Sequence, residues 1–191
     1  MTARRHRGRR VVAVLVLLGA VAACSGGGSD DGGSKDPAVQ PAKEGIDGVL
    51  AIRVSSAKHT LGEVDYDRHP PVGGDHNPSA AACGFYTQPV PDEYLVHTME
   101  HGAVWLAYAT DLSSDDLAVI RQVVSDNADT IATPYPDLDP GVKVVLSAWA
   151  RQLPLKSLDD PRLEKFVDRY QNGDQAPEAS VACGQLAPGQ G

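Results

Sequence analysis

The chain of 191 residues has few of the motifs that mark common catalytic classes. Its three cysteines form no Cys-x-x-Cys pair, which argues against a dithiol redox centre. It has no Gly-x-Ser-x-Gly nucleophile elbow and no glycine loop that would cradle a phosphate. No histidine follows His101, so the last 90 residues lack the commonest metal ligand and general base. Any histidine chemistry must therefore come from the first half.

Long hydrophobic runs are also scarce, and the longest, from Val11 to Ala23, follows five arginines between Arg4 and Arg10. As a helix these 13 residues would span roughly 20 Å, short of the roughly 30 Å hydrocarbon core of a bilayer. A basic start, a short apolar core and small residues before a cleavage site are typical of an export signal. We predict that residues 1–23 are a signal peptide. The sequence does not decide between the possible export routes.

The motif Val21-Ala22-Ala23-Cys24 resembles the lipobox of bacterial lipoproteins, in which the signal is cut before a cysteine that carries a diacylglyceryl group. The stretch from Ser25 to Gly33 is rich in Ser, Gly and Asp, the composition of a flexible linker. The resemblance implies lipidation of Cys24, a tether over residues 24–45 and attachment to the outer face of the cell membrane.

Few basic residues remain once the predicted signal peptide is removed. Without residues 1–23 and their five arginines, 12 basic side chains oppose 25 acidic ones, a formal net charge of −13. Such a surface repels nucleic acid phosphates and anionic headgroups, so we expect no nucleic acid partner. It would attract cations, although an acidic balance also serves solubility alone.

Setting Cys24 aside leaves Cys83 and Cys183, an even pair in an oxidising compartment. We predict a disulfide between them, closing a loop of about 100 residues, for which the chain-entropy estimate is about 4.7 kcal/mol. A metal site with two cysteines is the alternative.

Residues 46–191 are enough for one globular domain with its own core. The patterns predict a layered α/β or α+β domain with a small mixed sheet and two or three helices. Helices are expected at 91–101, 113–128 and from 160 onwards. Strands are expected near 49–54, 63–66, 103–108, 130–133 and 142–149, with a long loop over 69–91.

The phrase from His97 to Gly102 concentrates ligand-type residues. Pro91 followed by two acids is typical of a helix start, and a histidine followed by Gly102 is typical of a helix end. In a helix His97 and His101 lie four residues apart on one face and can share an ion. In a strand they would be roughly 13 Å apart, too far to do so. We favour the helix.

A metal site needs further ligands, and His76 in the Gly-Gly-Asp-His-Asn-Pro loop is the first candidate. His59 is the next, while Glu100 or Met99 would join only if the helix ended early. Histidine with carboxylate indicates zinc, whereas histidine with methionine indicates copper. We therefore expect one zinc or copper ion bound by His97, His101 and His76.

Two other functions stay open. His-x-x-Glu-His, here His97 to His101, matches the inverted zinc peptidase pattern, in which the glutamate activates water. Glu100 would then be the catalytic residue, with Glu164 or Glu178 as the acidic ligand, although we do not expect an enzyme. In the third hypothesis the domain is a binding or structural module of the envelope, and its histidines only build a polar core.

The chain contains a combination of short motifs between residues 56 and 184. They are Pro70-Pro71, Gly74-Asp75-His76, Cys83-Gly84-Phe85-Tyr86, His97 to Trp105, Ser147-Ala148-Trp149 and Pro177-Glu178. Together they resemble the bacterial domain-of-unknown-function family 3105, which is found in exported and membrane-anchored proteins. The resemblance covers residues 56–184 and implies one extracytoplasmic domain, without an established activity.

Overall fold

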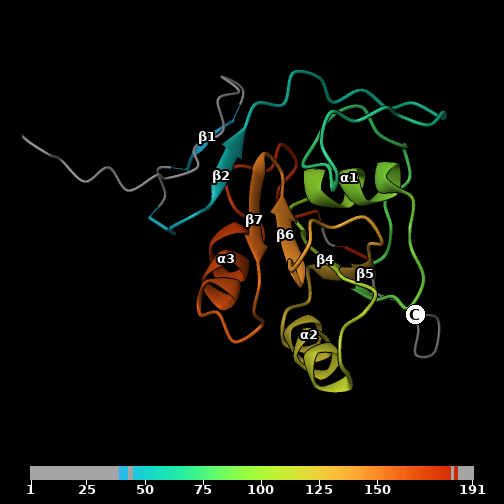
Figure 1. Cartoon of the computed structure of the whole chain (residues 1–191). Helices are drawn as coiled ribbons and strands as arrows, with labels where there is room; N and C mark the ends of the chain where they lie inside the picture. Colours follow the sequence, from blue (N-terminus) through green and yellow to red (C-terminus); the bar gives the residue numbers. More distant parts are fainter. Residues whose placement is uncertain (1–38, 43–44, 182, 185–191) are drawn as a thin grey trace, which may run out of the picture. The chain divides into compact units, whose positions relative to one another are not determined.

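The computed structural model describes residues 39–42, 45–181 and 183–184. The predicted signal peptide, Cys24 and most of the predicted tether lie outside these residues. Within them the chain forms a mixed α/β fold, as predicted (Figure 1). The helices are α1 (Asp92–Glu100), α2 (Ser114–Asp126) and α3 (Arg162–Tyr170).

One seven-stranded sheet runs through the described domain in the order β1-β2-β7-β6-β4-β5-β3. Its pairings are antiparallel except for β4 with β5 and β3 with β5, which are parallel. The strands are β1 (Val39–Pro41), β2 (Leu50–Ile52), β3 (Gly84–Phe85), β4 (Val104–Tyr108), β5 (Thr130–Pro134), β6 (Val144–Ala148) and β7 (Arg151–Leu155).

Strand β4 lies at the centre of the core because both of its faces are covered. Its five residues are all buried, as the continuous apolar run predicts. Alternate residues enter different apolar clusters: Val104 and Leu106 pack with α2 and α3, and Trp105 and Ala107 pack with α1. The helices therefore cover opposite faces of the sheet, α1 alone on one of them (Figure 1). In the described residues no helix is long and apolar enough to cross a bilayer.

The predicted helices form with small differences at their ends. The helix expected over 113–128 begins after Ser113, whose Oγ accepts the Asp116 N–H at 3.1 Å, and ends at Asp126. The phrase around His97 is helical through Glu100, so the helix prediction is confirmed and the strand alternative is wrong.

One strand prediction is wrong, and three strands were not predicted. Residues 63–66 form no strand, because Val64 N–H donates to the Glu93 carboxylate and the Tyr66 hydroxyl to the Asp75 carbonyl instead of to a neighbouring strand. Strand β7, which contains Pro154, was not predicted. The sheet also extends to β1, inside the span predicted as tether, and to the two-residue β3.

Helix α1 ends in a Schellman motif that turns the chain into β4. Gly102 N–H donates to Met99 O and Ala103 N–H to Thr98 O, at 3.0 and 3.2 Å. Gly102 has φ +102°, and a Cβ there would lie 2.9 Å from Asn172 Oδ1 and 3.1 Å from Asn172 Cα. Both the backbone angle and the contact therefore require glycine.

The predicted disulfide is confirmed. Cys83 and Cys183 are bonded, with their Cα atoms 5.6 Å apart, and their alternative use as metal ligands is excluded. Cys83 is buried in the α1 side of the core. The bridge therefore ties the C-terminal segment to the residues just before β3.

Removing the bridge should lower the free energy of unfolding by about 2–5 kcal/mol, because the unfolded chain loses a long closed loop. The test is urea unfolding of the Cys83→Ala, Cys183→Ala double variant, with the wild type in reductant as a matched measurement. A double variant as stable as the oxidised wild type would contradict this expectation.

Gly102→Ala should cost at least about 1 kcal/mol more than Gly141→Ala. Both glycines have positive φ, but a Cβ at Gly141 meets nothing within 4 Å, so this variant reports backbone strain alone. Equal unfolding free energies for the two variants would show that the contact with Asn172 carries no constraint.

Candidate metal centre

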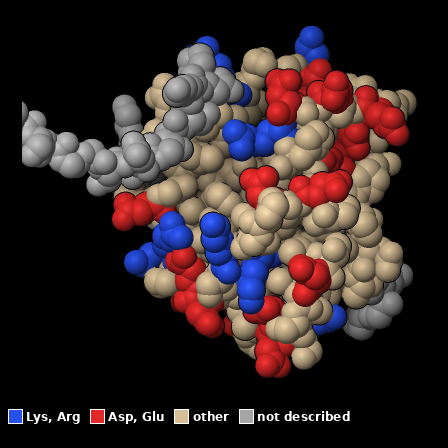
Figure 2. All heavy atoms as spheres, in the orientation of Figure 1, with Lys and Arg blue, Asp and Glu red and all other residues tan. Residues whose placement is uncertain are grey.

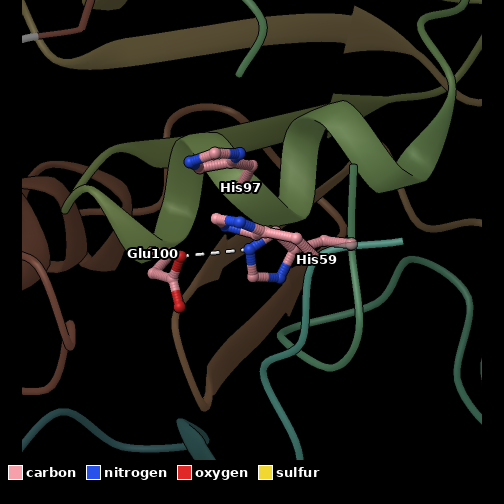
Figure 3. A group of neighbouring side chains, drawn as sticks. His59, His97 and Glu100 are labelled. Carbon is pink, nitrogen blue, oxygen red and sulfur yellow. Dashed lines mark ion pairs between the residues drawn. The ribbon is translucent and has the colours of Figure 1, made fainter. Parts of the chain in front are cut away.

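Four potential ligands meet beside the C-terminal half of α1. His97 and Glu100 come from the helix, and His59 and His76 from the long connection between β2 and β3. One ligand atom from each side chain lies within 4.8 Å of those from the other three. Figure 3 shows His59, His97 and Glu100 turned towards one another beside the helix.

The two loop histidines are held together by backbone pairing. His59 and His76 form an isolated parallel bridge, in which Thr60 N–H donates to His76 O at 2.7 Å and His76 N–H to Lys58 O at 2.9 Å. The carboxylate of Asp75 accepts from the Ser56 hydroxyl and from Lys58 N–H, and these bonds lower the Asp75 pKa. The bridge brings the two imidazoles to one side, with ring centroids 5.0 Å apart.

Backbone carbonyls orient the two most buried imidazoles. His76 Nδ1 lies 2.8 Å from Gly74 O, and His97 Nδ1 lies 2.6 Å from Asn77 O. A carbonyl oxygen only accepts, so each Nδ1 carries the hydrogen and each neutral ring has its lone pair on Nε2. Metal-binding histidines characteristically donate their second ring nitrogen in this way.

His76 Nε2 is the most telling atom of the group. The side chain is fully buried, and Nε2 lies 3.0 Å from Glu100 Oε2, a distance suited to an ion pair if the ring is protonated. The approach does not meet hydrogen-bond geometry, and Nε2 has no hydrogen-bond partner among the described residues. A lone pair that faces a carboxylate in a buried site is an unfavourable contact, which either a proton or a bound metal ion between the two atoms would relieve.

His97 supplies a second neutral nitrogen. Burial lowers its pKa, and the nearby His101 and His76 lower it further, against the raising effects of the Asn77 carbonyl and Glu100. A lowered pKa keeps the imidazole in the neutral form that binds metals. Its Nε2 lies 3.0 Å from His101 Nε2, so His101 must provide the hydrogen of that contact. An imidazole nitrogen has one lone pair, so His97 can bind an ion through Nε2 only after this contact with His101 is broken.

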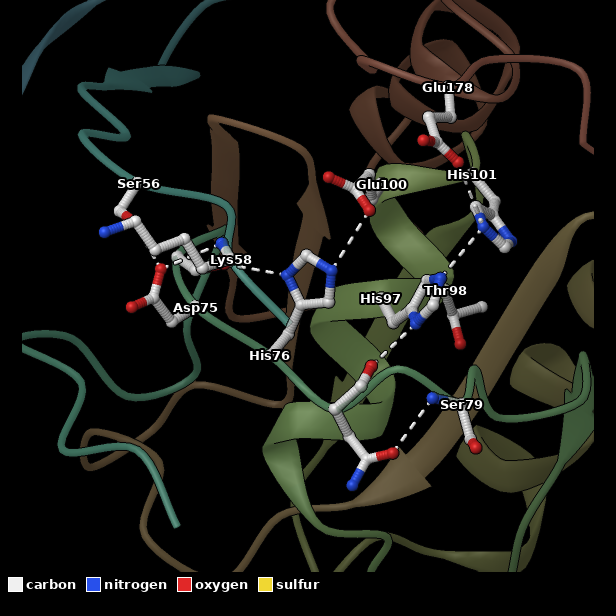
Figure 4. A network of polar contacts seen from close by, with 12 residues as sticks. Ser56, Lys58, Asp75, His76, Ser79, His97, Thr98, Glu100, His101 and Glu178 are labelled. Carbon is white, nitrogen blue, oxygen red and sulfur yellow. Dashed lines mark hydrogen bonds and ion pairs between the residues drawn. The ribbon is translucent and has the colours of Figure 1, made fainter. Parts of the chain in front are cut away.

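His101 lies next to the group of four and not in it. Its Nε2 also lies 3.5 Å from Glu178 Oε2, and the Glu178 N–H donates to the Glu100 carbonyl at 3.0 Å. Figure 4 shows the contact of His76 with Glu100 and, beside it, the contacts that join His97 through His101 to Glu178. The C-terminal segment thus closes the end of α1.

Glu100 joins the site although the helix continues through it, so the expectation that it could join only from a shortened helix is wrong. It lies three residues after His97, and residues three apart share a helix face. Met99 is instead fully buried in the apolar cluster with Leu95 and Trp105. His69 also lies elsewhere, with Asp92 and Tyr135.

Sequence reasoning did not find the carbonyl acceptors at Gly74 and Asn77. Backbone atoms leave no mark in residue identity, although the glycines and proline around His76 indicated a rigid loop there. The sequence also ranked His101 and His76 above His59 as metal ligands. The neighbouring residues of a loop histidine carry no signal that shows whether its side chain reaches the helix.

Comparison with known proteins identifies a protein family but no individual similar protein or structure. No curated protein and no solved structure shows significant similarity to the chain. The model of a protein family of unknown function, DUF3105, matches residues 58–185, which include all four residues of the site and both bonded cysteines. The chain therefore belongs to the DUF3105 family, as its motifs indicated.

Proposed function

We propose that this protein is an exported lipoprotein whose domain binds one zinc ion through His59, His76, His97 and Glu100. The observation that carries the proposal is the buried His76 Nε2, which faces Glu100 at 3.0 Å without a hydrogen bond. A divalent cation between the two would satisfy both groups and neutralise the buried carboxylate.

The group is close to the dimensions of a zinc site. Zinc binds nitrogen and oxygen at about 2.0–2.2 Å, so tetrahedral ligands lie about 3.3 Å from one another. The ligand atoms here lie within 4.8 Å, so loading requires the widest pair to close by up to about 1.5 Å. His59 is the exposed member and can supply much of that movement.

The donor set favours zinc over copper. Three imidazoles and a carboxylate suit zinc, whereas Cu(I) prefers sulfur ligands. Neither described cysteine is a thiolate, because Cys83 and Cys183 are bonded to each other, and Met99 is in the core. Cu²⁺ will also bind in vitro, since it generally exceeds Zn²⁺ in affinity for nitrogen and oxygen sites.

His76→Ala, His97→Ala and Glu100→Gln should each weaken zinc binding by at least about 10- to 100-fold, the loss that even an outer partner of a ligand causes. His69→Ala is the matched control, because His69 is a histidine outside the site. The measurements are zinc content after dialysis and calorimetric titration of the exported full chain, with circular dichroism to confirm folding.

Zinc at 100 times its Kd should stabilise the wild type by about 2.7 kcal/mol. A wild type that takes up no stoichiometric zinc, and whose melting temperature zinc does not raise, would contradict the metal proposal. The His76 and Glu100 pair would then be a polar core element, the alternative in which the domain is a structural module.

The proposal assigns no catalytic role. The zinc peptidase pattern uses the glutamate as a base beside two histidine ligands, His97 and His101. Here Glu100 is grouped with the ligands and lies 3.0 Å from His76 Nε2, while His101 is outside the group.

Export and lipid anchoring rest on the signal-like residues 1–23 and on Cys24, which lie outside the described residues. The disulfide supports an oxidising, extracytoplasmic location, since such bonds rarely persist in the cytosol. The anchor would hold the zinc site near the outer face of the membrane.

Cys24→Ala should move the protein from the membrane fraction to the soluble fraction and abolish labelling by a fatty acid, because the sulfur that carries the lipid is gone. Ser25→Ala is the control and should stay in the membrane fraction. Membrane association that survives in the Cys24 variant would overturn the anchor.

A further inference from the structure

The four ligand residues differ sharply in exposure. His76 is 0%, His97 5% and Glu100 6% exposed, whereas His59 is an exposed residue. Three of the proposed ligands therefore belong to the core, and one faces solvent. A structural zinc site is closed by protein ligands, and a site that exchanges ligands keeps one position accessible.

His59 is also the least constrained of the three imidazoles. His76 and His97 each donate Nδ1 to a carbonyl, but the ring of His59 forms no hydrogen bond described for this domain. Its ring contacts are with the rings of His76 and His97, both at 5.0 Å between centroids. The next residue but one, Leu61, is 87% exposed. The His59 ring can therefore swing away without opening the core.

A hollow of about 440 Å³ borders the segments that carry His59 and His76, although none of the four ligand residues lines it. Leu61 and Gly62, which follow the His59 segment, form part of its wall, and so does Asn77, whose carbonyl holds His97. The hollow is therefore part of the surroundings that a donor meets on its way to the exposed His59, and it is not itself the binding position.

The hollow is acidic, which limits what can enter it. Glu63, Asp92 and Glu93 line it, with Tyr66 and Tyr94. Figure 2 shows acidic side chains gathered over the region of α1 and the loops beside it. These carboxylates repel an approaching anionic ligand, so a neutral nitrogen donor is favoured over a carboxylate.

We propose that His59 is the exchangeable ligand of the zinc site and that a neutral imidazole from outside takes its place. This inference rests on the proposed zinc binding. In the exchange the bond from zinc to the His59 nitrogen breaks as a bond to the incoming imidazole nitrogen forms. Each imidazole binds through a nitrogen lone pair, so the exchange itself transfers no proton or electron. The domain would then accept or share an ion with a histidine side chain of a partner.

The test uses Co²⁺ in place of zinc, because its visible absorption reports coordination number and ligand exchange. His59→Ala should still bind one Co²⁺ through the three buried ligands, with an altered spectrum. Added imidazole should restore the intensity of the wild-type band in a saturable manner, and acetate at the same concentration should not. His76→Ala is the matched control, and imidazole should not restore its spectrum, because the position is buried.

The outcomes separate the two proposals. A wild type that binds neither Co²⁺ nor zinc overturns both. Normal metal binding by the wild type, with a His59→Ala spectrum that imidazole leaves unchanged, overturns only the exchange. Equal restoration of the His76 variant also overturns the exchange, because a buried position would then accept imidazole as well as the exposed one. Restoration by acetate overturns it too, because the acidic surroundings would then not exclude a carboxylate.

Discussion

The turn at Gly102 is the constraint on which the candidate site depends most. It joins α1, which carries His97 and Glu100, to β4, the strand whose two faces are both buried. The Schellman bonds end the helix at a defined residue, and Asn172 leaves no room for a side chain at the turn. Because β4 cannot move without disturbing both halves of the core, the helix and its two ligands hold a fixed position against the sheet.

A second level of order comes from the carbonyls of Gly74 and Asn77. Each accepts the Nδ1–H of a histidine and so leaves the Nε2 lone pair as the free acceptor of the ring. The Nε2 of His76 faces Glu100, whereas that of His97 accepts from His101 and must leave this contact to bind an ion. The bonds to the two carbonyls fix tautomer and ring orientation at once, which reduces the side-chain entropy lost when an ion binds. The carboxylate of Glu100 beside them supplies the opposite charge. Orientation of buried rings before binding distinguishes this group from histidines that merely line a surface.

The site combines a rigid interior with an accessible outer edge. The buried ligands belong to a helix and a tight loop, and the disulfide and Glu178 secure the C-terminal segment around them. His59 belongs to a short extended segment joined to His76 by two backbone hydrogen bonds. The affinity for the ion would come from the buried ligands, and the exchange of a ligand would occur at the exposed His59. The surrounding acidic side chains draw cations towards the opening.

The sequence by itself determined the elements whose signals are local. Periodicity and end signals predicted α1 with its stop at Gly102, the buried strand β4, the capped start of α2 and the face shared by His97 and His101. Parity of the cysteines predicted the bridge between Cys83 and Cys183.

Only the tertiary structure decided which histidines meet. His59 and His76 are 17 residues apart in a loop without periodicity, and the bridge between them depends on Asp75 and on the course of the whole connection. Glu100 enters the group, and Met99 does not, because the sheet covers one side of α1 and the loop covers the other. Such choices depend on contacts between distant segments, and neither composition nor spacing along one segment records them.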